Sequence, residues 1–461
     1  MLAAWHLLPK RRNFLYFAKG VVLGLCLAAP AGAQEADTSA ETFAALEARR
    51  AALFQATLSN PVDLDIAFEY ALISARVGDI EAAISTMERI LVFNPGLPRV
   101  QLELAVLYYR IGAIETAQHY LEAVRGQDLP PAVRAKVDEF SLSVEEASKP
   151  YRFSASIDFG MQAYSNANFA PDRDSIIIGG VPINLGPGAK AQSDASVFAL
   201  GQIHYTYDLP AQGALFEVDG TLYASKFFEL SRLDLNFLEV AFGPSFNLGR
   251  WGWDKSRLGV YGIVGGSTLG GSHYSTIGGA GLRLRTQIDN RTLLETQIEA
   301  RSINYSNTAD YPNATLQDGN TYRFRAQLIR SLSPGWTGSF AFEARQVDGE
   351  TDFNTFRGYG LTAKLNHDFR GPTDGILADN EPWSLLLAVG GISRDFAGPD
   401  PLIDPVNAQD DRGLWLEASL GIPLENQFSA YVTGQYYRQN SNYPTRDYDG
   451  VTLTYGVKKR F

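Results

Sequence analysis

Cysteine is nearly absent from this sequence of 461 residues, because Cys26 is the only one. It lies in a segment with the features of an export signal: basic residues without acidic ones, an apolar stretch at 20–29 and small residues at 31–33. The basic residues are Lys10, Arg11, Arg12 and Lys19. We expect residues 1–33 to be removed, which leaves a mature chain that begins near Gln34 and has neither disulfides nor thiol chemistry.

Long hydrophobic runs and an excess of positive charge are also missing. The apolar stretch at 20–29 is too short to cross a bilayer, and no later segment approaches the roughly 20 apolar residues of a membrane-spanning helix. A mature chain embedded in a membrane would therefore have to form a closed β-barrel, which satisfies its own backbone hydrogen bonds. After residue 33 there are 36 basic and 51 acidic side chains, a net charge of −15 that disfavours a nucleic-acid partner.

Histidine is scarce as well. After residue 33 the sequence has four, on separate predicted elements and without the spacing of metal ligands: His119, His204, His273 and His367. We therefore expect no metal site, no cofactor and no enzymatic activity, although a catalytic triad can assemble from distant strands.

The first feature of the chain after the export signal is a helical repeat. From Ser39 to Ser148 the sequence is rich in Ala, Leu and Glu with helical periodicity, and five positions recur after 34 residues, the tetratricopeptide period. They are Ala71, Gly78, Glu81, Ala83 and Ile90, which recur as Ala105, Gly112, Glu115, Ala117 and Val124. Small residues suit the points where paired helices cross, and glycine suits the turn between them. Because two repeats are marginal alone, we expect Glu41 to Leu58 and Ala132 to Glu146 to form flanking helices.

Repeats of this kind have a concave surface that commonly binds partners. The repeat pattern places seven residues on that groove: Phe68, Leu72, Arg76, Leu102, Val106, Tyr109 and Arg110. One interpretation is that a periplasmic client protein binds there. The other is that the apolar members contact a neighbouring helix or the following domain.

From Tyr151 to Phe461 the periodicity changes to alternation of apolar and polar residues, which is typical of transmembrane β-barrels. The segment at 292–302 is the clearest. Its apolar face has Leu294, Thr296, Ile298 and Ala300, and its polar face has Glu295, Gln297, Glu299 and Arg301. Large charged faces on consecutive strands suit a hydrated lumen, and the opposite faces suit lipid.

The alternation predicts 14 strands, at 151–164, 194–207, 214–229, 235–248, 258–268, 274–288, 292–305, 320–331, 336–347, 355–369, 383–396, 413–422, 427–439 and 447–461. An even number returns the carboxyl terminus to the side of the repeats. Long connections such as 165–193 fall on one side, which we take as extracellular, and short ones such as 289–291 on the other. The predicted architecture is a signal peptide (1–33), a periplasmic tetratricopeptide-repeat domain (34–149) and a 14-stranded antiparallel transmembrane β-barrel (150–461).

Aromatic residues near the predicted strand ends fit the interface girdles of a membrane barrel: Tyr205, Tyr207, Trp251, Trp253, Trp336, Trp383, Tyr436 and Tyr437. The last strand ends in Phe461. Thr454, Gly456 and Phe461 have the spacing of the signal that the barrel-assembly machinery recognises, whereas Lys459 departs from it. This machinery and outer-membrane lipid are therefore expected partners.

Four consecutive strands carry charged residues at the positions expected to face the lumen: Arg283, Arg285, Glu295, Glu299, Arg301, Arg323, Arg325, Glu343 and Arg345. Basic and acidic positions alternate between strands, so cross-strand ion pairs can form. These pairs either stabilise the wall or line a polar track for a substrate or plug.

The order of these features along the chain is similar to that of a known protein family. After the repeats, the phrase Pro130-Pro131-Ala132-Val133-Arg134 leads into a final helix, and Phe153 to Asn168 (FSASIDFGMQAYSNAN) opens the barrel. Along essentially the whole mature chain the sequence resembles the surface lipoprotein assembly modifier (Slam) family. The resemblance implies translocation or display of lipoproteins at the cell surface, with a lipoprotein client on the repeat groove.

Polysaccharide exporters also join such repeats to a barrel, and a passive porin is a further alternative. A glycan exporter should line its pore with aromatic platforms and acidic residues, whereas the four strands considered above mix Arg and Glu. That difference favours the assembly factor slightly.

Overall fold

The computed structural model describes residues 43–178, 181–211, 213–372 and 381–461, so the predicted signal peptide lies outside the described residues. The chain divides between Pro150 and Tyr151 into two compact units, one helical and one formed by a β-barrel. Each is described by itself.

The helical unit has six helices among its described residues: α2 (Phe43–Ser59), α3 (Leu64–Val77), α4 (Ile80–Phe93), α5 (Pro98–Arg110), α6 (Ile114–Arg125) and α7 (Pro131–Ser148). The pairs α3–α4 and α5–α6 are the two 34-residue repeats, which confirms the tetratricopeptide-type fold. Helices α2 and α7 are the predicted flanking helices; Glu41 lies outside the described residues.

The turn inside each repeat depends on glycine. Gly78 and Gly112 follow the first helix of each repeat and have φ angles of 95° and 80°, a left-handed conformation that other residues rarely adopt. Asp79 then caps α4, because its side chain accepts a hydrogen bond from the Ala82 N–H at 3.1 Å.

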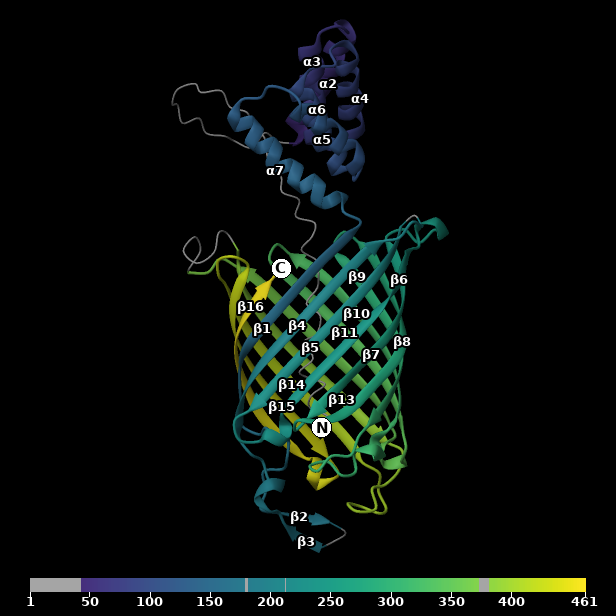
Figure 1. Ribbon diagram of the computed structural model, residues 1–461, viewed down its shortest axis with the longest axis vertical. Helices are drawn as coiled ribbons and strands as arrows, with labels where there is room; N and C mark the ends of the chain where they lie inside the picture. Colours follow the sequence, from purple (N-terminus) through teal and green to yellow (C-terminus); the bar gives the residue numbers. More distant parts are fainter. Residues whose placement is uncertain (1–42, 179–180, 212, 373–380) are drawn as a thin grey trace. The chain divides into compact units, whose positions relative to one another are not determined.

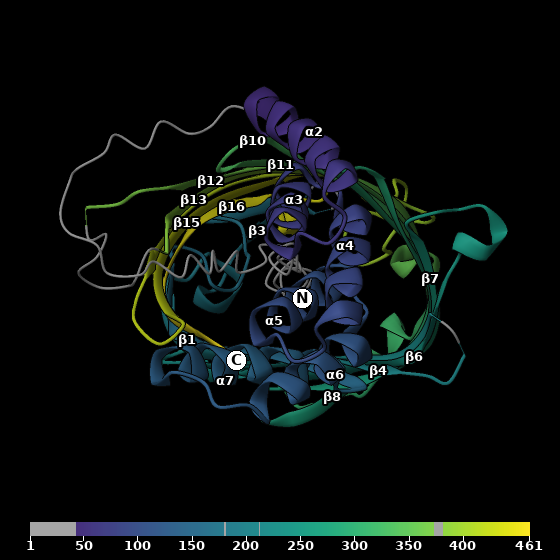
Figure 2. The same cartoon turned by 90° about the horizontal axis from the view of Figure 1, so that it is seen from above.

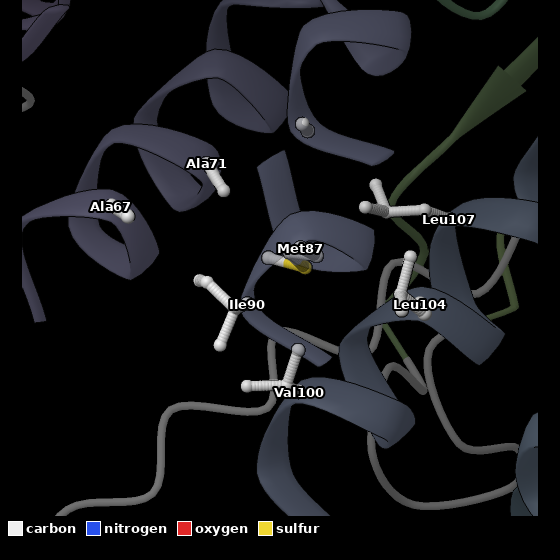
Figure 3. Packing of buried hydrophobic residues seen from close by; sticks show 8 residues of the cluster. Ala67, Ala71, Met87, Ile90, Val100, Leu104 and Leu107 are labelled. Atoms are coloured by element: carbon white, nitrogen blue, oxygen red, sulfur yellow. The ribbon is translucent and has the colours of Figure 1, made fainter. Parts of the chain in front are cut away.

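The core of the helical unit forms where paired helices cross. Ala71, Ala83, Ala105 and Ala117, the recurring small residues of the repeat, are fully buried, with no exposed side-chain area. Figure 3 shows Ala71 facing the cluster around Met87 between α3, α4 and α5. None of the described helices has both the length and the apolar character needed to cross a membrane.

The second unit is a closed antiparallel barrel of 14 strands, which confirms the predicted fold class. Figure 1 shows the strands running obliquely around the wall, and Figure 2 shows them as a ring. The strands are β1 (Tyr151–Tyr164), β4 (Asp194–Asp208), β5 (Ala214–Phe227), β6 (Leu235–Asn247), β7 (Ser256–Leu269), β8 (Ser272–Asp289), β9 (Thr292–Tyr305), β10 (Gly319–Ser333), β11 (Trp336–Gly349), β12 (Phe356–Phe369), β13 (Trp383–Phe396), β14 (Asp410–Pro423), β15 (Phe428–Ser441) and β16 (Tyr448–Arg460).

Each strand pairs with its neighbour in sequence, and β1 closes on β16. At this seam the Phe461 N–H donates to the Ala155 carbonyl at 2.9 Å, and the Ala155 N–H donates to the Phe461 carbonyl at 3.3 Å. Two short strands, β2 (Ser175–Ile178) and β3 (Val181–Asn184), form a separate two-stranded sheet within the connection at 165–193.

The two faces of the wall differ as the alternation predicts. On β9 the Ile298 side chain is 54% exposed, whereas its neighbours Gln297 and Glu299 are 7% and 5% exposed. The same alternation recurs on β8, where Leu282 is exposed and Arg283 is buried. An apolar outer face and a polar inner face are what a barrel in lipid requires.

Connections of unequal length lie at the two ends of the barrel. Connections at 165–193, 306–318 and 397–409 join strands at one end, and the turns at 290–291 and 334–335 join them at the other. The connection at 370–382, between β12 and β13, is an exception to the expected rule, because it is long and lies at the end with the short turns. One aromatic residue differs from the expected girdle. Tyr436 is exposed outside the wall, but the adjacent Tyr437 points inward, where its hydroxyl donates to the Asn166 carbonyl at 2.7 Å. Strand alternation makes it impossible for both to face lipid.

Candidate functional site

The inner wall of the barrel is the candidate site with the most chemistry. All nine charged residues predicted for the lumen lie on the inner face, and the structure joins them to three acidic residues of earlier strands: Glu217 and Asp219 on β5 and Glu239 on β6. We call these twelve residues the ionic sector.

At one side of the ionic sector, two arginines of β8 bind acids on both sides. Arg283 contacts Asp219 at 3.1 Å and Glu217 at 3.8 Å. Arg285 contacts Glu217 at 3.5 Å and Glu295 at 3.0 Å. Because β5 and β8 are separated by two strands, the contacts of these arginines with Glu217 and Asp219 can form only across the concave inner surface.

The centre of the ionic sector is more buried. Arg301 binds Glu239 at 2.6 Å and Glu299 at 3.0 Å, and its side chain is 7% exposed. Glu299 also accepts from Arg323 at 2.8 Å and from the Tyr261 hydroxyl at 2.9 Å. Charges that leave water are stable only when paired and hydrogen-bonded in this way.

The far side of the ionic sector is on β10 and β11. Glu343 binds Arg345 at 2.7 Å and Arg325 at 3.8 Å. Beyond it, Arg394 on β13 binds Asp411 on β14 at 3.3 Å, a pair that the sequence analysis did not identify.

The three acids of β5 and β6 were also missed. Glu217, Asp219 and Glu239 occupy inward positions of predicted strands, so alternation alone could have found them. Their partners, however, lie some 60 or more residues further along the chain. Only the curvature of the closed barrel brings the two groups together.

A second part of the inner wall, on β1, β4, β5, β14 and β15, is aromatic. We call this the aromatic sector, which comprises Tyr164, Phe198, Tyr223, Trp415, Tyr431 and Tyr437. The sequence predicted a lumen that mixes Arg and Glu, in contrast to the aromatic lining expected of a glycan exporter. That contrast therefore holds only for the ionic sector. The ionic residues predicted from the sequence lie on β8, β9, β10 and β11, whereas the aromatic residues lie on β1, β4, β5, β14 and β15.

Rings of the aromatic sector lie over glycines of neighbouring strands. A Cβ at Gly456 would come within 2.4 Å of the Tyr431 ring, and one at Gly390 within 2.4 Å of the Trp415 ring. These glycines leave room for a ring to lie flat against the wall. Trp415 and Tyr223 are only 8% and 5% exposed, so the rings contribute mainly to the wall itself.

The seven residues predicted for the repeat groove differ in their exposure to solvent. Arg76 and Arg110 are exposed, and Phe68, Leu72 and Val106 are half-buried. Leu102 departs from the prediction, because it is 8% exposed and belongs to the hydrophobic core with Leu121 and Val124.

Tyr109 also differs from a free groove residue. Its ring packs edge-on against Phe140 of α7, with 5.4 Å between ring centroids. The last helix thus covers part of the predicted surface, as the alternative interpretation of the apolar groove residues allowed.

A polar contact between the first helices of the two repeats was not predicted. Arg99 of α5 lies 4.7 Å above the Phe68 ring of α3, and Glu103 lies one turn further along α5 near Arg99 and Arg76. Burial raises the pKa of the Glu103 carboxyl above its ordinary value, and the two arginines oppose that effect only in part. We call Phe68, Arg76, Arg99 and Glu103 the α3–α5 face.

The residues of the predicted assembly signal lie on both sides of the last strand. Thr454 and Gly456 face the lumen, and the Phe461 ring is 60% exposed. The Lys459 ammonium lies 4.6 Å from the Phe428 ring and 5.6 Å from the Phe461 ring.

One histidine belongs to the polar network of the inner wall. His204 on β4 hydrogen-bonds Asp219 at 2.7 Å, and Asp219 also binds Arg283. Across the described ranges, no group of three or more His, Cys, Asp or Glu side chains is arranged to hold a metal ion.

No protein-family model and no curated protein matches this chain. Among solved structures, the chain is similar to the Yersinia enterocolitica type III secretion translocator chaperone SycD, with 13% identity over 22% of this chain and 72% of that one and a TM-score of 0.21. It is also similar to a bacterial polysaccharide outer membrane secretin, with 10% identity over 67% and 98% of the two chains and a TM-score of 0.35. A third, an outer membrane channel from Pseudomonas putida F1, has 10% identity over 67% and 95% and a TM-score of 0.36. At these scores the similarities carry nothing about substrate or partner.

Proposed function

We propose that this chain is an outer-membrane factor that delivers client proteins, lipoproteins foremost, to the cell surface. The observation that carries the proposal is the direct linkage of the two units. Only Lys149 and Pro150 lie between the last helix of the tetratricopeptide-type unit and the first strand of the 14-stranded barrel. A client bound to the repeats is thereby tethered to the barrel, which raises its effective concentration there.

The α3–α5 face supports client binding. Arg76 and Arg99 are exposed cations, the half-buried Phe68 ring lies under Arg99, and the half-buried Glu103 carboxyl lies near both arginines. An extended peptide with an apolar side chain and an acidic neighbour would match this set of groups.

The barrel supports membrane placement. Its outer face is apolar and its inner face is charged and polar, as expected for a barrel in the outer membrane. Because both ends of the barrel sequence lie at the same end of the barrel, we assign that end and the repeats to the periplasm. Assembly would then proceed through the barrel-assembly machinery.

A second candidate, export of a polysaccharide, is favoured by the aromatic sector. Sugars bind aromatic faces, and Tyr431 and Tyr437 are half-exposed on the inner wall. The burial of Trp415 and Tyr223 weighs against a continuous sugar track.

Deletion of residues 34–148, with the signal retained, tests the proposal. We expect the barrel to insert, because the two units have separate cores, and to show normal heat-modifiable migration. Surface exposure of lipoproteins, measured by protease accessibility on intact cells, should collapse while the single-channel conductance of the purified barrel is unchanged. Undiminished lipoprotein exposure would contradict the proposal. Loss of surface polysaccharide with normal lipoprotein exposure would favour the second candidate.

A further inference from the structure

The junction between β1 and β16, which closes the barrel, is the shortest of the fourteen between the described strands (Figure 1). Nine residue pairs align there, whereas the next shortest junction, between β6 and β7, aligns eleven. Because β1 and β16 are the first and last strands of the barrel, no loop joins them, unlike the neighbours at every other junction. Separation of the wall at this junction therefore breaks the fewest residue pairs and strains no loop.

Two glycines face each other in the middle of this junction. Gly160 of β1 aligns with Gly456 of β16, so neither contributes a side chain to the contact. Rings of the flanking strands lie over them instead. A Cβ at Gly160 would come within 2.7 Å of the Phe198 ring of β4, and one at Gly456 within 2.4 Å of the Tyr431 ring of β15.

These rings meet across the junction. Tyr431 packs against a cluster formed by Phe198, Leu200 and Tyr223 of β4 and β5. Apolar contacts on the inner face thus hold together the strands on either side of the β1–β16 pair. We call Phe198, Tyr223 and Tyr431 the aromatic clasp, which has to part before the junction can separate.

The end of the junction assigned to the cell surface is reinforced by residues 165–173, which follow β1 and which we call the strap. The Asn166 side-chain amide donates to the Asp449 carbonyl of β16 at 2.9 Å, and the Asn166 backbone carbonyl accepts from the Tyr437 hydroxyl of β15. The Phe169 ring packs against Tyr437, with 5.0 Å between ring centroids. The strap therefore ties the end of β1 to β15 and β16 by contacts outside the strand pairing.

The periplasmic part of the junction has side-chain contacts that water or lipid can replace. Asp158 of β1 binds Lys458 of β16 at 3.2 Å on the inner face, which borders a hydrated lumen. On the outer face Phe159 aligns with Val457, and lipid tails can take the place of either side chain at little cost. Since unpaired backbone groups are costly in hydrocarbon, separation is easiest at this aqueous end of the wall.

We propose that the barrel opens sideways between β1 and β16 from its periplasmic end, with the strap as the hinge and the aromatic clasp as the closure. Opening connects the lumen to the lipid phase. A lipoprotein needs such a path, because its acyl chains belong in lipid and its polypeptide in water. Use of the opening by a client rests on the proposed function, whereas the opening itself is a property of the barrel alone.

Hydrogen–deuterium exchange of the full chain in lipid nanodiscs tests the opening without a client. Amides 455–459 of β16 and 222–226 of β5 lie in the same rows of the wall. We expect amides 455–459 to exchange at least tenfold faster than amides 222–226. Amides 451–453, next to the strap, should exchange as slowly as amides 222–226.

A cysteine pair across the junction should lock it. Ser156→Cys/Arg460→Cys joins β1 to β16, and the control Gln202→Cys/Thr221→Cys joins β4 to β5 in the same row, since Ser156 aligns with Gln202. Directly opposed residues of neighbouring strands have the spacing that a disulfide needs. The first disulfide should slow exchange of amides 455–459 at least fivefold until a reductant is added, and the control should change it less than twofold.

Removal of one ring tests the aromatic clasp. Tyr431→Ala should raise exchange of amides 455–459 at least threefold. Trp415→Ala removes a ring that likewise covers an opposed glycine, Gly390, but at the junction of β13 and β14, and should change it less than twofold. Heat-modifiable migration verifies that each barrel is folded. The proposal is overturned by equal exchange of amides 455–459 and 222–226, by equally fast exchange of amides 451–453, by a disulfide without effect, or by equal effects of the two ring variants.

The same disulfides test the route of the client in cells. Surface exposure of lipoproteins should fall at least fivefold with Ser156→Cys/Arg460→Cys, return after reduction and stay normal with Gln202→Cys/Thr221→Cys. Normal exposure with the locked junction, where deletion of residues 34–148 abolishes it, overturns the route. Normal exposure with both the lock and the deletion means that the proposed function fails, and the exchange rates still decide whether the junction opens.

Discussion

Arg301 on β9 donates to Glu239 on β6 at 2.6 Å, across the two strands that lie between them. A contact of this kind requires a curved wall with both side chains on the concave face. It also explains how a guanidinium that is 7% exposed can remain charged inside the barrel, since Glu299 holds its other side.

Loss of this cation should weaken the barrel. Arg301→Met leaves the half-buried Glu239 without its arginine and the buried Glu299 with Arg323 alone, so we expect the free energy of unfolding to fall by about 3 kcal/mol. The control is Arg412→Met, because the Arg412 side chain is 55% exposed and its pairs with Asp395 and Asp410 should contribute less than about 1 kcal/mol. Urea unfolding in lipid vesicles, followed by tryptophan fluorescence, measures both; equal losses would be inconsistent with a buried ionic sector.

The helix crossing in the second repeat should not tolerate added volume. Ala105 has no exposed area, so Ala105→Leu forces the helices apart and should cost about 1–3 kcal/mol. Ala123→Leu, at an exposed position of α6, should change stability by less than about 0.5 kcal/mol. Thermal loss of the helical circular dichroism signal of the full chain compares the two variants, and an unchanged midpoint for Ala105→Leu would refute close crossing.

Glu103 should make the helical unit less stable as the pH rises. Its folded-state pKa is raised by burial, so the neutral acid is favoured in the folded state; that stability is fully present below the unfolded pKa near 4.5 and is lost as the pH rises through the raised value. Glu103→Gln removes this dependence. We therefore expect the variant to gain stability relative to the wild type between pH 4 and pH 8 in thermal melts, and a constant difference would show that the carboxyl is solvated.

The alternation of residues predicted all fourteen strands because lipid and lumen impose a period of two along the barrel. It could not predict contacts such as Arg283 with Asp219, which depend on curvature, nor the aromatic sector, where a ring such as Tyr431 needs Gly456 on the next strand. In the repeats, the 34-residue period identified the crossing alanines. The same period placed Tyr109 on an open groove, because it carries no information about Phe140 on the helix that follows.

The end of the chain should matter more for assembly than for the finished barrel. Deletion of Phe461 removes one pair of backbone hydrogen bonds to Ala155 and an exposed ring, so insertion should slow several-fold while the unfolding midpoint changes little. Phe461→Ala keeps the backbone bonds and tests the ring alone. The time course of heat-modifiable migration with the assembly machinery measures insertion, and unaltered kinetics in both variants would rule out recognition of the terminal residue.

The α3–α5 face gives the most direct test of client delivery. Replacement of Tyr109 is unsuitable, since its ring supports Phe140, but Arg76 is exposed on α3 and can be replaced by a photo-crosslinking amino acid without disturbing the core. Glu122, exposed on the second helix of its repeat, is the matched control position. In cells that produce the full chain, we predict ultraviolet-dependent crosslinks from position 76 to a lipoprotein on its way to the surface and none from position 122. The absence of lipoprotein crosslinks at position 76, or the same crosslinks at both positions, would contradict the account.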